Sequence, residues 1–336
     1  MTTPRPIVRL SARLSAGLSA GLSAGRSAEP SADPSPQPAA AGAAAVAPER
    51  RGTALMVAGG LLLGTLGVFV EEGGASPLAT VWFRCAFGLA ALSAWALATG
   101  RWRELRLAPR TLAAALGAGV LMLLNWALFF AAIERTSIAV ATVVFHVQPL
   151  WVIALAAWWL REPVSRAQLG GVLLALAGLV LATGLAEPGN GVAAHDGRYA
   201  AGLLMCLGGS LSYAGVTLIA KLARGASGFS LAWWQCLSGS VLLAWVPWLQ
   251  GWPAGAGALA WLAGLGVLHT GLAYVLLYGG MARLPAGRIA VLQFVYPVAA
   301  IGVDALVYGR ALSALQGAGV LLMGWALWRV GRRHRE

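Results

Sequence analysis

The chain is dominated by apolar stretches that are long enough to cross a membrane. They begin after Arg50 and alternate with short loops rich in Gly, Pro and charged residues. A helix needs about 20 mainly apolar residues to cross roughly 30 Å of hydrocarbon, and it satisfies its own backbone groups there. The sequence predicts ten such helices, over residues 53–71, 78–98, 111–132, 138–160, 167–185, 199–220, 229–249, 257–280, 286–308 and 312–330.

Composition and charge also exclude a soluble protein. The chain is 59% hydrophobic and 11% charged, with a mean hydropathy of +0.73, whereas soluble domains are about a quarter charged. All but four of the 24 Lys and Arg residues fall where this topology places cytoplasmic segments, and the exceptions are Arg84, Arg135, Arg198 and Arg310. Because Lys and Arg resist translocation, both termini are predicted to be cytoplasmic, in the inner membrane of a cell. The net charge of +12 therefore fixes orientation and contacts anionic lipid, and a nucleic-acid binder is excluded.

The two ends of the chain differ from the helical part. Residues 1–48 consist mainly of Ala, Ser, Pro, Gly and Arg, with a Leu-Ser-Ala-Gly/Arg unit recurring from Leu10. Such a segment buries too little apolar surface to fold, so it is predicted to be a disordered cytoplasmic tail. Because it is rich in Arg and poor in acids, a transit peptide is an alternative, and so is a misassigned start codon. Residues 331–336 form a short basic tail.

The sequence contains an internal repeat. A shift of 148 residues aligns Trp126 with Tyr274 and Pro149 with Pro297, and a slip of three more aligns Cys85 with Cys236. Residues 52–185 and 198–330 are therefore predicted to be two copies of five helices each. Since five is odd, the copies enter the membrane from opposite sides. Such inverted repeats are the usual basis of alternating access, with the substrate near the midplane between the halves.

Several stretches resemble the EamA domain of the drug/metabolite transporter superfamily. They are Pro77-Leu78, Arg84, residues 124–133, Pro149, Arg161-Glu162-Pro163 and residues 170–178, with Tyr274, Tyr278, Pro297 and residues 317–324 in the second copy. The resemblance implies a secondary transporter of a bacterial inner membrane, often an exporter of amino acids or other small metabolites. It also implies a central cavity between the first four helices of each copy. The second copy departs from the pattern at two positions. Gln235 stands at the position equivalent to Arg84, and Arg310 stands at the position equivalent to Glu162.

Polar residues near the middle of the fourth and ninth helices are the leading candidates for substrate binding. His146 and Gln148 precede Pro149, which removes a backbone hydrogen bond and loosens the helix. A polar group at the midplane is costly unless it meets a partner or a wet cavity. An interhelical hydrogen bond that only packs the bundle is the alternative. The mirrored residues are Gln293 and Tyr296 before Pro297, and both prolines are predicted hinges.

Other polar and aromatic residues are predicted to line the same cavity. They are Asn125, Trp126, Ser212, Tyr213, His269, Thr270 and Tyr274. Aromatic faces and neutral hydrogen-bonding groups suit amphipathic zwitterions or aromatic compounds. His146 or His269 titrates near neutral pH and could couple transport to protons. Asp304, close to the outer end of the ninth helix, is read as an interfacial residue, with a proton site as the alternative.

Two further charges are predicted to be structural. Arg84, inside the second helix, is expected to form an ion pair with Glu71 or Glu72, with substrate contact as the alternative. Glu162, at the cytoplasmic end of the fourth helix, is expected to cap a helix or to pair with Arg166.

The sequence gives no indication of an enzyme, a cofactor or a metal. Its three cysteines, Cys85, Cys206 and Cys236, show no ligand or disulfide spacing. It contains no HExxH, Gly-x-Ser-x-Gly or P-loop motif and no paired deep carboxylates. The chain is therefore predicted to be an all-α membrane transporter that moves small organic metabolites outward by alternating access. The alternatives are a channel-like facilitator and a multidrug efflux protein on the same scaffold.

Overall fold

The computed structural model describes residues 38–186, 197–253, 255–309 and 311–332, and the regular structure in these residues is helical throughout. Residues 1–37 of the predicted N-terminal tail, residues 333–336 of the C-terminal tail, and Arg310 lie outside the described residues. Apart from the first turn of α1, the described residues belong to one compact unit that starts at Ala43.

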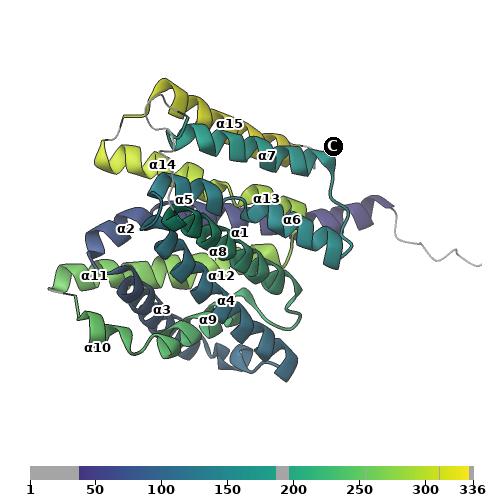
Figure 1. Cartoon of the computed structure of the whole chain (residues 1–336). Helices are drawn as coiled ribbons and strands as arrows, with labels where there is room; N and C mark the ends of the chain where they lie inside the picture. The colour runs from purple at the N-terminus through teal and green to yellow at the C-terminus, as the bar shows by residue number, and fades with distance from the viewer. Residues whose placement is uncertain (1–37, 187–196, 254, 310, 333–336) are drawn as a thin grey trace, which may run out of the picture. The chain divides into compact units, whose positions relative to one another are not determined.

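The first half of the chain forms seven α-helices and one short 3₁₀ helix (Figure 1). They are α1 (Pro38–Gly64), α2 (Leu66–Gly73), α3 (Pro77–Thr99), η1 (Arg101–Leu105), α4 (Pro109–Ile133), α5 (Ile138–Phe145), α6 (Gln148–Trp159) and α7 (Arg166–Ala182). Helix α1 begins inside the range predicted to be a tail, because residues 39–46 are mostly Ala, the strongest helix former.

The second half repeats this organisation (Figure 1). It comprises α8 (Gly197–Leu222), α9 (Gly228–Leu242), α10 (Val246–Gln250), α11 (Ala256–Gly264), the π-helical η2 (Leu265–Leu272), α12 (Ala273–Met281), α13 (Ala286–Leu292), α14 (Val295–Tyr308) and α15 (Ala314–Arg332). All ten predicted segments are mostly helical. Among the described residues, seven helices are long and apolar enough to cross a membrane, so the chain is a multi-pass membrane protein.

The repeat is visible in how equivalent helices begin. At the start of α7, Ser165 Oγ accepts a hydrogen bond from Gln168 N and Gln168 Oε1 accepts one from Ser165 N, both at 3.1 Å. At the start of α15, Ser313 and Gln316 make the same pair of bonds, at 3.1 and 3.0 Å. This capping box satisfies two backbone N–H groups that the first helical turn leaves open. Two copies of the same local device therefore start the last helix of each half.

Equivalent residues of the two halves also contact one another reciprocally. A Cβ placed on Gly88 would lie 3.1 Å from Cys236 Sγ, and one placed on Gly239 would collide with Cys85 Sγ. The rings of Trp126 and Tyr274, equivalent in the repeat, are 6.3 Å apart. Residues that surround a two-fold axis contact their own equivalents in this way. The halves are therefore packed about a pseudo-two-fold axis between α3 and α9.

The η1 segment supplies a pH-dependent contact outside the membrane spans. Glu104 accepts hydrogen bonds from Arg101 Nε and, at 2.6 Å, from Ser227 Oγ at the start of α9. The adjacent Arg101 guanidinium, with the Ser227 hydroxyl, lowers the pKa of Glu104 below its ordinary value of 4.5.

We expect this contact to make a small, acid-sensitive contribution to stability. Because the folded-state pKa is lowered, the contribution is complete above about pH 4.5 and disappears as the pH falls through the folded-state pKa. It should be below about 1 kcal/mol, since the side chain is 31% exposed. The measurement is the melting temperature of purified wild type and E104Q between pH 6 and pH 3. The two proteins should converge in acid, and a constant difference would contradict the assignment.

Candidate functional site

Two membrane-spanning segments are interrupted near their middle. Helix α5 gives way to α6 at residues 146–147, and α13 gives way to α14 at residues 293–294. Each interruption lies just before a proline, Pro149 in the first half and Pro297 in the second, and these prolines are equivalent in the repeat. Proline has no N–H to donate within a helix, so the preceding turn loses a hydrogen bond. Interrupted helices in equivalent positions are typical of substrate sites in transporters with inverted repeats.

The two interruptions face each other. The His146 ring lies 5.8 Å from the Phe294 ring and stacks on the Tyr296 ring at 6.1 Å, with 17° between the planes. His146 Nδ1 is 2.7 Å from Thr142 O, and because a carbonyl only accepts, Nδ1 carries the hydrogen. Nε2 is then the accepting nitrogen of the neutral ring. His146 and Phe294 are equivalent in the repeat, so the interruptions meet close to the pseudo-two-fold axis.

A threonine of α8 joins the glutamines of both interruptions. Gln148 Nε2 and Gln293 Nε2 each donate to Thr217 Oγ1 at 3.3 Å. Thr217 Oγ1 in turn donates to Tyr213 O at 3.0 Å, so its hydroxyl hydrogen is used. Gln293 Oε1 is buried and has no hydrogen-bond partner among the described residues. The three side chains form one polar contact between α6, α8 and α13.

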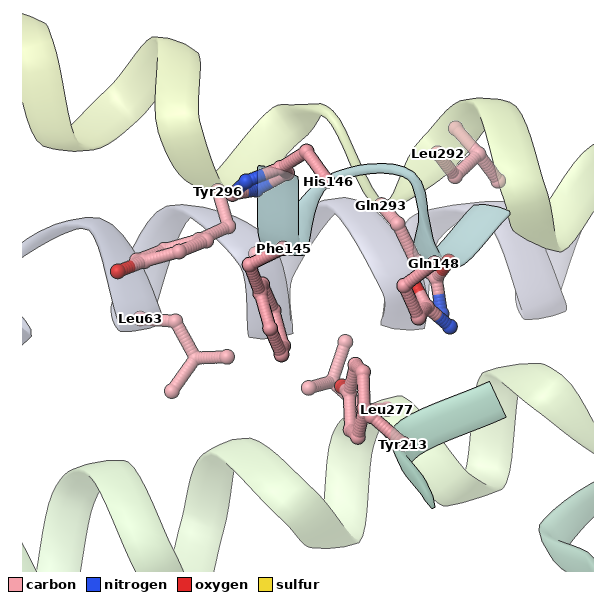
Figure 2. A pocket seen from close by; sticks show the side chains of 10 residues that line it. Leu63, Phe145, His146, Gln148, Tyr213, Leu277, Leu292, Gln293 and Tyr296 are labelled. Atoms are coloured by element: carbon pink, nitrogen blue, oxygen red, sulfur yellow. The ribbon is translucent and has the colours of Figure 1, made fainter. Parts of the chain in front are cut away.

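A small cavity lies beside this contact (Figure 2). Its lining residues are Gly60, Leu63, Phe145, His146, Gln148, Tyr213, Leu277, Leu292, Gln293 and Tyr296. Figure 2 shows Leu63, Phe145, Tyr213 and Leu277 converging on this space, with Gln148 and Gln293 next to each other. Its volume of about 40 Å³ has room for a few water molecules and not for an organic metabolite.

A larger cavity of about 660 Å³ begins at Tyr296, which lines both cavities. It lies among α1, α2, α5, α7, α14 and α15, and its lining includes Thr142 and two carboxylates, Glu71 and Asp304. Its volume is in the range of about 300–1,000 Å³ that is usual for pockets holding small organic molecules. The aromatic ring of Tyr296 therefore separates a space large enough for a metabolite from the smaller cavity at the helix interruptions.

Arg84 makes other contacts than the ion pair that was predicted for it. The residue is only 3% exposed, its Nε donates to Thr270 Oγ1 at 2.8 Å, and its guanidinium carbon lies 4.3 Å from the centre of the Trp126 ring. Among the described residues no ion pair includes Arg84, so the expected contact with Glu71 or Glu72 is wrong. The neighbouring span turns as a π-helix at this depth, which brings Thr270 toward α3.

His269 occupies the same π-helical stretch. Its Nε2 lies 2.8 Å from Thr65 Oγ1, and Thr65 Oγ1 donates to Leu62 O at 2.9 Å. The Thr65 hydroxyl therefore connects the His269 ring of η2 to the backbone of α1. The ring also packs edge-on against Phe69 at 4.6 Å. Short π-helical stretches within α-helices often occur at functional sites.

The predicted candidates fall into three groups, and the first two border the same apolar core. His146, Gln148, Tyr213, Gln293 and Tyr296 line the small cavity. A second group surrounds Arg84. Trp126 and Thr270 contact Arg84, Tyr274 packs near Trp126, and His269 precedes Thr270 in η2.

Asn125 and Ser212 line neither cavity. Asn125 Nδ2 donates to Gly209 O at 3.0 Å, and Ser212 Oγ donates to Gly208 O at 2.9 Å. Thr217 and Phe145 are site residues that were not predicted. Thr217 lies one helical turn after Tyr213, and this spacing places both side chains on one face of α8.

A second polar contact closes the end of the bundle where α6, α8 and α13 meet. Glu162 Oε1 pairs with Lys221 Nζ at 2.9 Å, and Glu162 Oε2 accepts a hydrogen bond from Ala286 N at 3.1 Å. Lys221 Nζ also donates to Leu284 O at 3.0 Å. Glu162 therefore caps a helix as expected, but the helix is α13, and Lys221 takes the place predicted for Arg166.

Comparison with known proteins agrees with this architecture. The sequence profile of the EamA-like transporter family matches twice, over residues 50–184 and 200–330. The "Uncharacterized transporter YxxF" of Bacillus subtilis (strain 168) is 25% identical over 301 residues, which cover 86% of this chain and 93% of that protein. An "Uncharacterized transporter" of Archaeoglobus fulgidus is 30% identical over 285 residues, covering 83% and 97%. "Protein RarD" of Streptomyces exfoliatus is 29% identical over 273 residues, covering 75% and 81%.

The fold also has a counterpart among solved structures. One crystal structure superposes with a TM-score of 0.73 over 84% of this chain and 97% of the other, at 22% sequence identity. This likeness concerns the fold alone. The two profile matches coincide with the two halves that share capping boxes, helix interruptions and reciprocal contacts. The chain is a membrane transporter that belongs to the EamA-like transporter family.

Proposed function

We propose that this chain is a secondary transporter that exports small organic metabolites, amino acids or related aromatic compounds, by alternating access. The proposal rests on the meeting of two interrupted helices at a cavity whose lining includes histidine, glutamine and aromatic side chains. Interrupted helices change their packing at low cost, because the hydrogen bonds at the break are already lost. A site between two inverted halves is exposed to either side when one half rocks against the other.

The proposed topology has ten crossings, with both termini cytoplasmic in the inner membrane. Seven crossings have the required length and hydropathy. The remaining three are α7, which is apolar but shorter, the interrupted pair α9 and α10, and α15. The shared capping boxes of α7 and α15 support treating these two helices as equivalent crossings. The distribution of Lys and Arg supports the orientation.

In this topology the larger cavity opens toward the outer side of the membrane. The cavity of about 660 Å³ lies at the outer ends of α2 and α14, and the contact between Glu162 and Lys221 closes the cytoplasmic end. A substrate would bind between Gln148 and Tyr296 once α5–α6 and α13–α14 move apart, since about 40 Å³ is too small. Aromatic rings there suit an apolar body, and the glutamine amides suit polar groups.

Removing the Gln148 amide should lower transport without lowering the amount of folded protein. The Gln148 side chain is buried, and its amide donates a hydrogen bond to Thr217 of α8. A bound substrate would take the place of Thr217 as the partner of this amide, and Q148A removes the amide. We expect a fall of about tenfold in exchange of labelled amino acids by proteoliposomes, the effect of roughly 1.4 kcal/mol.

Ser212→Ala is the matched control, because Ser212 bonds only to the backbone of its own helix among the described residues and lines neither cavity. S212A should exchange amino acids at nearly the wild-type rate. If membrane abundance of Q148A falls in step with transport, Gln148 is a packing residue and the site assignment fails.

A further inference from the structure

A buried guanidinium in the structure lacks a counter-charge. Arg84 lies within the span Pro77–Thr99 and is 3% exposed. No ion pair of the described residues includes it, and its Nη2 has no hydrogen-bond partner there. A buried charge is costly unless it is paired and hydrogen-bonded, and an arginine inside a membrane span marks a functional site by default.

The contacts that Arg84 does make leave its charge uncompensated. Thr270 Oγ1 accepts from Nε at 2.8 Å, but a hydroxyl is neutral. The Trp126 ring, 4.3 Å from the guanidinium carbon, offers only the weak negative potential of an aromatic face. The Thr270 hydroxyl holds the Nε edge, and the guanidinium carbon lies over the Trp126 ring. At the Nη end, Nη2 keeps N–H groups that no described residue accepts.

A second unpartnered donor lies at the other end of the same aromatic cluster. The Trp126 and Tyr274 rings are 6.3 Å apart, and the Tyr274 and Tyr278 rings are 5.5 Å apart. Tyr278 Oη donates to Gln235 Oε1, while Gln235 Nε2 is buried without a partner among the described residues. Gln235 is the equivalent of Arg84 in the second half. Two open N–H donors and three aromatic rings therefore form one continuous cluster.

We propose that Arg84 binds the carboxylate of the transported substrate. A carboxylate matches a guanidinium because its two oxygens accept two parallel N–H bonds, a geometry that an amine or an alcohol lacks. The surrounding rings suit an apolar or aromatic body attached to that carboxylate. The inference rests on the proposed transport function and narrows it, because amino acids and aromatic acids would be substrates and the corresponding amines would not.

Thermal stabilisation of the purified protein tests this binding without measuring transport. The probes are L-phenylalanine, 3-phenylpropionate and phenethylamine, with sodium chloride and sodium sulfate at matched ionic strength. A ligand that binds only the folded state raises the melting temperature according to its affinity. We expect both carboxylates to stabilise the wild type, and the amine and inorganic salts to have no such effect. Arg84→Gln should weaken carboxylate binding at least tenfold.

Two further variants separate binding from folding. Arg84→Lys keeps the positive charge but loses the planar fork, so it should fold and still bind carboxylates about tenfold more weakly. Arg106→Gln removes one exposed positive charge of a loop and should bind as the wild type does.

The proposal is overturned if R84K and R84Q bind carboxylates with wild-type affinity, or if neither carboxylate stabilises the wild type. Equal stabilisation by chloride or sulfate would identify an inorganic anion site and overturn it as well. If proteoliposomes exchange phenethylamine and not the carboxylates, the transporter stands and only the carboxylate site fails.

Discussion

In E162Q the cytoplasmic end of the cavity should open. A cysteine introduced at Leu292, which lines the small cavity, should react at least tenfold faster with a charged thiol reagent added from the cytoplasmic side. Inside-out vesicles provide that side under the proposed topology. The native cysteines Cys85, Cys206 and Cys236 are buried, and vesicles that lack the Leu292→Cys change give their background reaction.

The size of this effect follows from how completely the Glu162 carboxylate is used. One oxygen pairs with Lys221 and the other caps α13, so α6, α8 and the turn before α13 meet at one side chain. The paired side chains are 25% and 16% exposed. Breaking a fully buried pair costs about 3–5 kcal/mol and an exposed one under about 1, so we expect roughly 2 kcal/mol here. That value changes the balance between closed and open states more than tenfold.

Glu104→Gln is the matched control for this experiment. It removes a carboxylate that the proposed topology places on the same side, but Glu104 contacts Arg101 and Ser227 instead of α6 and α13. It should leave the Leu292→Cys reaction rate unchanged. An E162Q protein that keeps its fold and reacts no faster than the wild type would show that the Glu162 contact does not close the cavity.

Gly319→Ala should destabilise the protein strongly. Helices α7 and α15 lie side by side (Figure 1), and a Cβ on Gly319 would lie 2.5 Å from Gly178 O and from Ala182 N. Both are backbone atoms, so the helices would have to separate. Small residues that let helix backbones touch are a main source of helix association in membranes. We expect a loss of about 2–3 kcal/mol, measured as a lower melting temperature and lower membrane abundance.

The control is Gly324→Ala on the same helix. A Cβ on Gly324 has no atom within 4 Å, so this change keeps the helix spacing and slightly raises helix propensity. G324A should therefore match or exceed the wild-type melting temperature. Equal melting temperatures for G319A and G324A would contradict the close contact between α7 and α15.

Much of the fold could be predicted because its determinants are local. Length and hydropathy identify helices that must satisfy their backbone groups within lipid. The interruptions at residues 146–147 and 293–294 lie next to Pro149 and Pro297, whose effect on a helix does not depend on tertiary context.

The contacts of the polar side chains could not be predicted in the same way. Which way a side chain faces depends on the rotation of each helix about its axis, and small residues such as Gly209 set this rotation by allowing close packing. Asn125 therefore faces the backbone of α8 instead of a cavity. The partner of Arg84 depends on a π-helical stretch, and Glu162 meets Lys221 only through the packing of α6 on α8. Neither contact has a local sequence signal.

Counterflow tests most directly whether the cavity opens to one side at a time. Proteoliposomes containing the purified protein are loaded with unlabelled amino acids and diluted into a trace of the labelled mixture. A carrier that alternates between two openings should accumulate label transiently above its equilibrium level, and Q148A should lose about nine tenths of this accumulation. Flux that does not saturate and is the same with and without preloading would identify a channel. Folded protein that gives no counterflow for any amino acid would contradict the proposed function.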